Sequence, residues 1–472
     1  MRQAVLLPTA GRLAALALLL TPVCPTGSTC AGADQETVEV RGEQMAVWPT
    51  EDLRKRGFDV SEIPRDENAA WIYIDAGNTY LDVPNELGNA FDYAVKKGWP
   101  QDHQRFKKWL TSRENREAIK LARKGSKMER CQMPCFGDPE GSVIGILLPN
   151  LRHFRMLAKI VVADGRRLAA QKDYRGAMEN YTSVLRMGHD VTQGITVIES
   201  LVGVACWNIG ESAVRDLVLR HDIPKQDLAA IFEEWKELAP RVPTVRRGFE
   251  SERLMGTSIV DEVVSRPTHL MGGLRQLSQY QSVDSVVRVS DGWDRLEARL
   301  GQVFLPDRTI KRHMADHYDT LIEMARLPYY DERVRNFDES ELIRSIPEWD
   351  VLSRVMLPSL ARARVLGVRC RTETRVTAVA LALRLHALEN RGKYPAQLAD
   401  LGVEIDPEDL VDPFGGGEFA YVKNAGAWKL YSVGPDGRDN DGKPGKRWDT
   451  EGTDMVCVFP PDPVEPFESE EN

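Results

Sequence analysis

The chain lacks the short motifs that mark many enzymes. Its 472 residues contain no phosphate-binding Walker loop and no glycine-rich dinucleotide fingerprint. Residues 141–145 have a serine between two glycines but lack the residue that a nucleophile elbow places between glycine and serine. The three glycines at 415–417 follow a proline–phenylalanine turn and precede an expected strand, so we interpret them as loop residues. These absences argue against catalysis through any of these motifs.

An excess of positive charge is missing as well. The chain has 62 Lys and Arg residues against 71 Asp and Glu residues, which gives a formal net charge of −9. This balance argues against a general nucleic-acid binder. The most basic stretch, residues 105–130, spreads its charges around a predicted helix that also holds Trp109, Ile119 and Leu121. We therefore interpret it as a solvated helix face, not as a phosphate-binding patch.

Long apolar runs are absent near the N-terminus too. The most apolar stretch there, residues 13–20, has only eight residues. It follows Arg2 and Arg12 and is succeeded by small residues ending at Ala33, which is the order of a secretory signal peptide. A stable membrane span needs about 20 apolar residues. We predict that residues 1–33 are removed and that the mature chain is exported to the periplasm or the medium, without a stable membrane span. The alternative is a membrane anchor formed by an uncleaved N-terminal segment.

Cysteines are few, and two of the seven lie inside the predicted signal peptide. In an oxidising compartment, Cys131 and Cys135 either form a local disulfide or stay free. A zinc site would need a second pair of ligands, and none lies nearby in the sequence. The odd number of mature cysteines leaves at least one free thiol, for which Cys206 in an apolar helix is the best candidate.

Helical periodicity dominates the expected body of the protein, residues 34–368. Between residues 148 and 220, apolar residues recur at steps of three and four in three successive segments, of which the last is predicted to be a central helix. The first two segments resemble a tetratricopeptide hairpin, with Gly165, Tyr174, Ala177 and Tyr181 in the matching positions. No second copy follows, so we interpret them as one antiparallel hairpin inside a larger helical domain. An irregular insertion is expected at about 243–310, and helices at 307–326 and 340–364.

The pattern changes at Thr372, where a predicted helix carries two apolar stripes. The first stripe is Val376, Val379, Ala380, Leu383 and Ala387, and the second is Leu381, Leu385 and Leu388. Two stripes predict that the helix is covered on one side by its own sheet and on the other by the helical body. Three strand patterns follow, at 419–422, 428–433 and 455–459. The expected fold is mainly α, with a multi-helix body followed by a small α+β module at 369–459, one helix on a three-stranded antiparallel sheet. Residues 460–472 are proline-rich and acidic, which predicts a disordered tail.

An ordered series of motifs in this module resembles a known family. The helix ends in Glu-Asn-Arg-Gly-Lys-Tyr-Pro at 389–395, and Leu-Ala-Asp-Leu at 398–401, Asp-Pro-Phe-Gly at 412–415 and Leu-Tyr-Ser-Val-Gly-Pro-Asp-Gly at 430–437 follow. Over about 90 residues this resembles the periplasmic domain of the major pseudopilin of type II secretion systems. The whole chain is also similar to a group of long exported bacterial proteins with a helical body and such a module. A pseudopilin begins with a methylated phenylalanine and a long membrane helix, whereas here the module follows about 370 other residues, so only the globular fold and an ion site are expected to carry over.

One candidate ion site lies in the loop at 434–454. Its carboxylates alternate with glycines, a pattern that suits calcium, which prefers six to eight oxygen ligands. The core at 439–442 resembles part of an EF-hand loop, although Gly437 stands where that motif has a ligand. The pseudopilin resemblance also implies calcium in this loop. We predict a calcium site, with a solvated acidic turn as the alternative. The candidate ligands are Asp436, Asp439, Asp441, Asp449 and Asp454.

Two other pairs of residues are weaker candidates. His313 and His317 lie four apart on one predicted helix face, but Met314 stands where a zinc protease has its catalytic glutamate, so a structural role is expected. Glu250 and Glu252 lie two apart and should point about 200° away from each other on a helix.

The sequence therefore favours a non-enzymatic exported envelope protein, a scaffold whose helical body binds a protein partner. The alternative is a hydrolase or other enzyme with a cleft between the body and segment 243–310.

Overall fold

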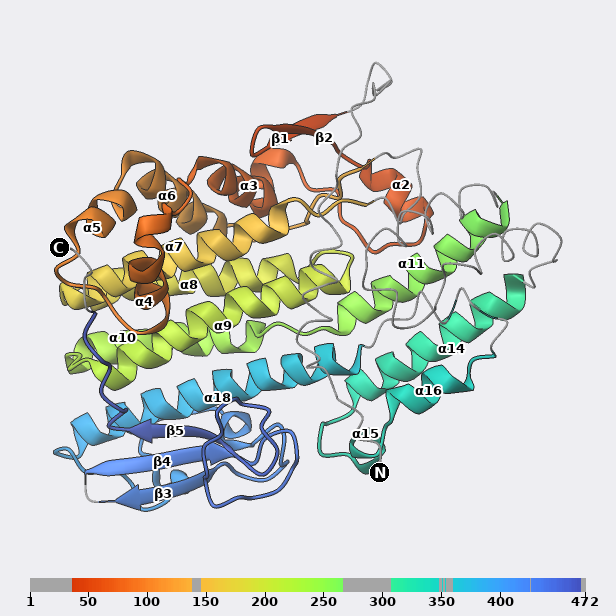
Figure 1. Ribbon diagram of the computed structural model, residues 1–472. Helices are drawn as coiled ribbons and strands as arrows, with labels where there is room; N and C mark the ends of the chain where they lie inside the picture. Colours follow the sequence, from red (N-terminus) through yellow and green to blue (C-terminus); the bar gives the residue numbers. More distant parts are fainter. Residues whose placement is uncertain are drawn as a thin grey trace, which may run out of the picture.

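In the computed structural model, long helices form a layered body, and a small sheet lies along one side of it (Figure 1). The structure describes residues 36–137, 146–265, 307–347, 350, 353, 360–424 and 426–467. The predicted signal peptide therefore lies outside the described residues. The expected fold class, a mainly helical body followed by a small α+β module, is confirmed.

The N-terminal layer consists of a β-hairpin and short helices. They are β1 (Thr37–Val40), β2 (Glu43–Ala46), α2 (Thr50–Lys55), α3 (Ala69–Thr79), α4 (Gly88–Lys96), α5 (Gln104–Leu110) and α6 (Arg113–Ser126). Side chains fix where two of these helices begin. The Asn68 side chain accepts a hydrogen bond from the N–H of Ala70 at the start of α3, and Ser112 accepts one from Asn115 at the start of α6. Such bonds satisfy N–H groups that have no partner within the helix.

Four consecutive helices form the centre of the body. They are α7 (Asn150–Ala170), α8 (Tyr174–Val191), α9 (Val197–Arg220) and α10 (Lys225–Leu238). Asp173 caps α8, and Thr196 and Glu199 form a reciprocal capping box at the start of α9. These helices lie where the periodicity predicts them. Gly165 of α7 faces Tyr181 of α8 so closely that a Cβ atom at position 165 would lie 2.3 Å from the tyrosine ring.

Helix α9 is the core helix of the body. Among the described residues it alone is long and apolar enough to cross a membrane, yet 61% of its most apolar stretch is buried inside the protein. Trp207, Val214 and Leu217 are buried in the main hydrophobic core with residues of α7, α8 and α18. Its apolar character is therefore explained by burial within the protein.

A helical pair and two short helices extend the body. They are α11 (Arg246–Ser265), α14 (Asp307–Arg326), α15 (Glu332–Arg335) and α16 (Glu339–Ser345). The insertion expected at 243–310 thus begins as the regular helix α11, and residues 266–306 lie outside the described residues. The helix expected at 340–364 is wrong as one unit, because α16 ends at Ser345, shortly before Pro347, and another helix begins at Ala361.

The C-terminal module contains one long helix and a three-stranded antiparallel sheet. The elements are α18 (Ala361–Glu389), β3 (Ala420–Asn424), β4 (Ala427–Ser432) and β5 (Met455–Phe459), with β4 in the centre. Tyr421 pairs with Leu430, which pairs in turn with Cys457 on the other side. The boundary expected between residues 368 and 369 falls inside α18, so body and module share a continuous helix.

The two apolar stripes of α18 are buried on opposite sides of the helix. The first packs with Trp428 and Leu430 under the sheet, and the second, through Leu381 and Leu385, joins the core of the body. The indole N–H of Trp207 on α9 donates to the Thr374 hydroxyl on α18 over 2.9 Å. The expectation for Leu388 is wrong, because its position at the last turn leaves it 45% exposed.

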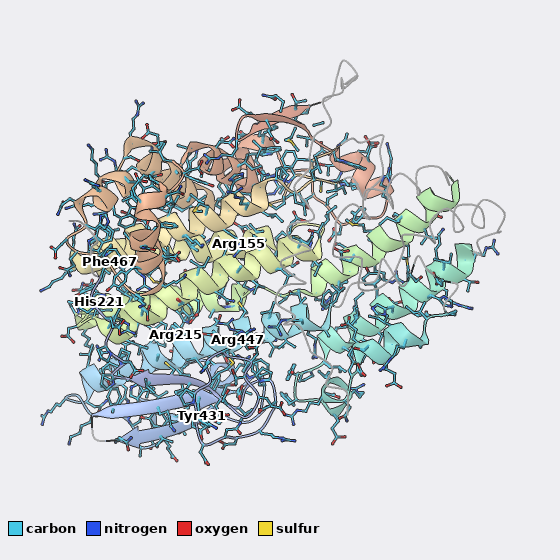
Figure 2. The ribbon with its side chains drawn as sticks, viewed as in Figure 1. Arg155, Arg215, His221, Tyr431, Arg447 and Phe467 are labelled. Carbon is cyan, nitrogen blue, oxygen red and sulfur yellow. The ribbon has the colours of Figure 1, made fainter. Side chains whose placement is uncertain are left out.

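The C-terminal segment was expected to be disordered, and for residues 460–467 that expectation is wrong. Figure 2 shows Phe467 at the end of the body near α4, and its ring centroid lies 5.3 Å from that of Tyr93 in α4 and 5.7 Å from that of His103. Arg220 donates to the Asp462 carbonyl over 2.8 Å. These contacts compensate for the lost chain entropy, which composition alone could not reveal. Residues 468–472 lie outside the described residues.

The five described cysteines are free, so Cys131 and Cys135 are not joined to each other. Cys135 is buried and Cys131 is partly buried. Burial raises the pKa of both thiols well above the usual range, which keeps them protonated and unreactive.

Candidate functional site

The acidic loop, residues 434–454, is organised by hydrogen bonds from its own backbone. The buried carboxylate of Asp454 accepts the N–H groups of Asn440 and Gly442, at 3.1 and 2.7 Å. Asp436 accepts the N–H of Gly452 at 3.0 Å, and Asp439 accepts that of Asp441 at 2.9 Å. The carboxylates of the loop thus fix the conformation of its backbone.

The fifth predicted ligand, Asp449, takes part in a different contact. Its carboxylate pairs with Arg362 of α18 at 2.7 Å and with Arg447 at 3.1 Å. The guanidinium groups of Arg362 and Arg369 also lie over the ring of Trp448. Asp449 therefore holds the acidic loop against α18.

Calcium binding by these carboxylates stays a prediction. Within the described ranges, no three or more His, Cys, Asp or Glu side chains come together in a group that could hold a metal. If the loop binds calcium, the protein should melt at a higher temperature with millimolar calcium than with a chelator. Asp439→Ala together with Asp441→Ala should abolish that rise, and equal melting temperatures in the two conditions would show that the loop is a solvated acidic turn.

The depression between α11 and α14 corresponds to the cleft of the enzyme hypothesis. It encloses about 610 Å³ and is lined by charged side chains that pair with one another, such as Arg253 with Asp319 at 2.7 Å. Glu250 pairs with Arg246 at 2.9 Å, whereas Glu252 turns away and accepts the N–H of Val197 at 3.1 Å. Burial raises the pKa of Glu252 to about 7. The two carboxylates diverge, as their spacing predicts, and do not form a catalytic pair.

The histidine pair on α14 does not share a partner. The Nδ1 atom of His313 contacts the Asp350 carboxylate at 2.7 Å. His317 is buried, and burial lowers its pKa to about 4, so its ring is neutral at physiological pH. Neither ring belongs to a group that could hold a metal in the described part of the chain.

A groove between α6, α7 and α8 is the strongest candidate site. It encloses about 710 Å³. We call it the α6–α8 groove. Its lining includes six basic and three acidic side chains: Arg116, Lys120, Arg123, Lys124, Lys127 and Arg167, with Asp164, Asp173 and Glu179. The groove therefore carries a surplus of positive charge on a protein whose net charge is −9.

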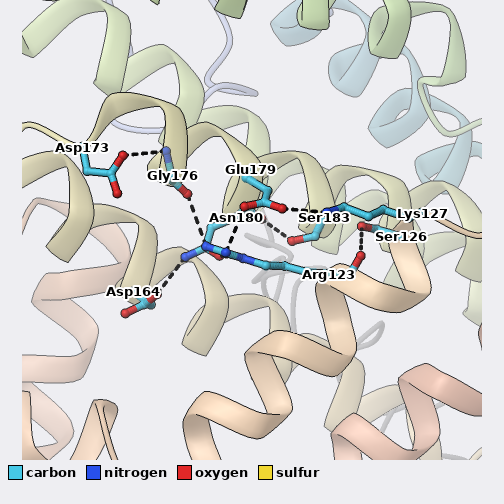
Figure 3. Close-up of polar contacts among 9 residues, drawn as sticks. All are labelled: Arg123, Ser126, Lys127, Asp164, Asp173, Gly176, Glu179, Asn180 and Ser183. Carbon is cyan, nitrogen blue, oxygen red and sulfur yellow. Dashed lines mark hydrogen bonds and ion pairs between the residues drawn. The ribbon is translucent and has the colours of Figure 1, made fainter.

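The base of the α6–α8 groove is held by the fully buried amide of Asn180 (Figure 3). Its oxygen accepts the Nε–H of Arg123 at 2.7 Å, and its nitrogen donates to Asp164 at 3.0 Å. Asp164 also pairs with Arg167 at 2.7 Å. A buried amide with both ends satisfied fixes its neighbours in one arrangement.

The chain matches no protein-family model, no curated protein and no solved structure. What the α6–α8 groove can do must therefore be read from its own chemistry.

The rim of the groove, which we define as Arg116, Lys120, Lys124 and Lys127 of α6 and its C-terminal cap, is exposed, whereas the base is buried. Lys127 pairs with Glu179 at 2.8 Å, and Lys120 pairs with Glu117 at 3.3 Å. Arg116 and Lys124 are exposed, and neither forms an ion pair with any described residue. The sequence predicts a solvated face over 105–130 and does not reveal the groove, because α7 and α8 form its other walls. The spacing of Arg116, Lys120 and Lys124 at steps of four was the available signal, since such residues share one side of a helix.

Proposed function

We propose that the protein is a non-enzymatic exported scaffold that binds a partner protein in the α6–α8 groove. The observation that carries the proposal is a concave surface with a rigid polar base and two cations, Arg116 and Lys124, left without an ion pair among the described residues. Polar groups held in place before binding lose little entropy when a partner arrives. The C-terminal module then serves as an accessory or docking unit that moves with the body, because α18 belongs to both.

The enzyme hypothesis has less support from the same observations. The charged groups between α11 and α14 are engaged with one another, and the groups at the base of the α6–α8 groove are engaged likewise. Catalysis needs a nucleophile or a general base within reach of a substrate. In the described ranges, neither hollow presents a serine, cysteine or histidine.

The proposal is tested by photo-crosslinking in the cells that make the protein. A photoreactive residue replaces Thr111, which lines the groove, or Thr79, which does not. The two positions have the same local hydrogen bond, because each threonine hydroxyl donates to the carbonyl four residues before it, over 2.8 Å at Thr111 and 2.7 Å at Thr79.

We expect position 111 to give a discrete adduct in the envelope fraction and position 79 to give none. Mass spectrometry of that adduct should show a mature chain that starts near Asp34. Equal labelling from both positions would contradict binding in the groove, and a cytoplasmic chain that retains residues 1–33 would contradict export.

A further inference from the structure

The carboxylates of the α6–α8 groove are already used by the protein itself. Asp164 holds Arg167 and the Asn180 amide, and Glu179 holds Arg123 and Lys127. Asp173 accepts the N–H of Gly176 as the cap of α8. The cations available to a ligand are therefore two of the rim, Arg116 and Lys124.

The spacing of the two available rim cations, Arg116 and Lys124, determines how far apart two matching carboxylates must lie. The cations are eight residues apart on α6, which corresponds to about 12 Å along the helix axis. An extended peptide advances roughly 3.3 Å per residue, so side chains four residues apart are separated by about 13 Å and point to the same side. Two carboxylates at such positions match the two cations.

The groove wall between the cations is partly apolar. Ile119 of α6 lies between them in sequence and lines the groove together with Leu168 of α7. Both side chains also contact the core, so the wall is supported from behind. An apolar side chain midway between two carboxylates would cover this wall and lose water contact, which favours binding.

The mixed lining favours a peptide over a phosphate polymer. Peptides bring N–H donors as well as carboxylates, so their backbone can face Asp173 and Glu179 without repulsion. Nucleic acids and anionic lipids present phosphate oxygens, which would meet those same carboxylates, and the net charge of −9 opposes both.

We infer that the α6–α8 groove recognises an extended acidic segment of a partner protein, with carboxylates four residues apart and an apolar residue midway between them. This inference rests on the proposed function. The recognised segment has the order acidic residue, any residue, apolar residue, any residue, acidic residue.

The test uses the full mature chain and a fluorescein-labelled peptide containing Glu-Ser-Leu-Ser-Glu, followed by fluorescence anisotropy. We expect saturable binding that weakens as salt rises from about 50 to about 300 mM. The peptides Gln-Ser-Leu-Ser-Gln and Glu-Ser-Ser-Ser-Glu should both bind more weakly. Arg116→Gln together with Lys124→Gln should weaken binding of the first peptide by roughly three- to thirty-fold.

A matched control is Lys107→Gln together with Lys108→Gln, which removes two exposed cations of α5 that do not line the groove, and it should leave the affinity unchanged. Equal loss in both double variants would overturn the inference, as would rim-dependent binding of poly(dT) or of phosphatidylglycerol vesicles in place of the peptide. If the peptide does not bind while position 111 still crosslinks a partner, the inference fails and the proposed function stands. If both fail, the groove is not a binding site.

Discussion

Replacing Gly203 with valine is expected to lower the free energy of unfolding by at least about 3 kcal/mol. A Cβ atom at position 203 would lie 2.5 Å from the carbonyl oxygen of Gly188 on α8, and one at position 188 would lie 2.8 Å from the backbone nitrogen of Trp207 on α9. Backbone atoms cannot rotate away as a flexible side chain can. The two helices would have to separate along the core of the body, exposing apolar side chains that are now fully buried.

Urea denaturation followed by circular dichroism measures this loss. Gly88→Val is the control, because Gly88 has helical backbone angles at the start of α4 and no atom lies within 4 Å of its added Cβ. That variant should change stability by less than about 0.5 kcal/mol. If Gly203→Val is as stable as Gly88→Val, the close crossing of α8 and α9 does not determine the stability of the body.

Arg215→Met is expected to cost about 3–5 kcal/mol, because it removes the more buried of two cations from a cluster between α9 and α18. Figure 2 labels Arg215 between these helices. Its guanidinium contacts Glu211 of α9 at 3.0 Å and Glu373 of α18 at 2.5 Å. The carboxylate side chains are only 1% and 12% exposed. Without Arg215, Glu211 would lose its ion pair and face Glu373, which would keep only its contact with Arg369 at 3.1 Å.

The loss should depend on pH in a defined direction. Burial already raises the pKa of Glu211 to about 7 in the intact protein. Removing Arg215 raises the pKa of Glu211 further and raises that of Glu373 from its present lowered value, because the unlike charge that favoured ionisation is gone. A carboxyl with a raised folded-state pKa binds its proton more readily when folded than when unfolded, so the penalty is largest above that pKa and shrinks as the pH falls through it. Arg215→Met should therefore be least stable near pH 8 and recover part of the loss near pH 5.5.

Arg246→Met provides the matched control. Arg246 also pairs with a glutamate four residues away, Glu250, but both side chains are largely exposed. Such pairs contribute about 0–1 kcal/mol. A loss for Arg215→Met no larger than that for Arg246→Met, or one that grows as the pH falls, would contradict the role assigned to the buried cluster.

The sequence by itself determined the elements whose signals are local. Apolar residues at steps of three and four placed α7, α8 and α9. The period-two strands of the module were placed to within one or two residues. The two stripes of α18 predicted burial on both sides, because each stripe needs its own cover. These features follow from which side chains lie on one face of a helix or strand, which the order of residues fixes.

Only the tertiary structure decided the features that depend on distant neighbours. The α6–α8 groove exists because Asn180 and Asp164 are brought against Arg123, which is 57 residues from Asn180 in sequence. The acidic loop is held in place by its own N–H groups and by Arg362, 87 residues from Asp449. Likewise, residues 460–467 became ordered through Tyr93, 372 residues from Glu465. A residue pattern shows which partners a side chain could bind, but the free energy of the whole folded chain determines which of them it does bind. A segment becomes ordered only if its contacts offset the conformational entropy that it loses.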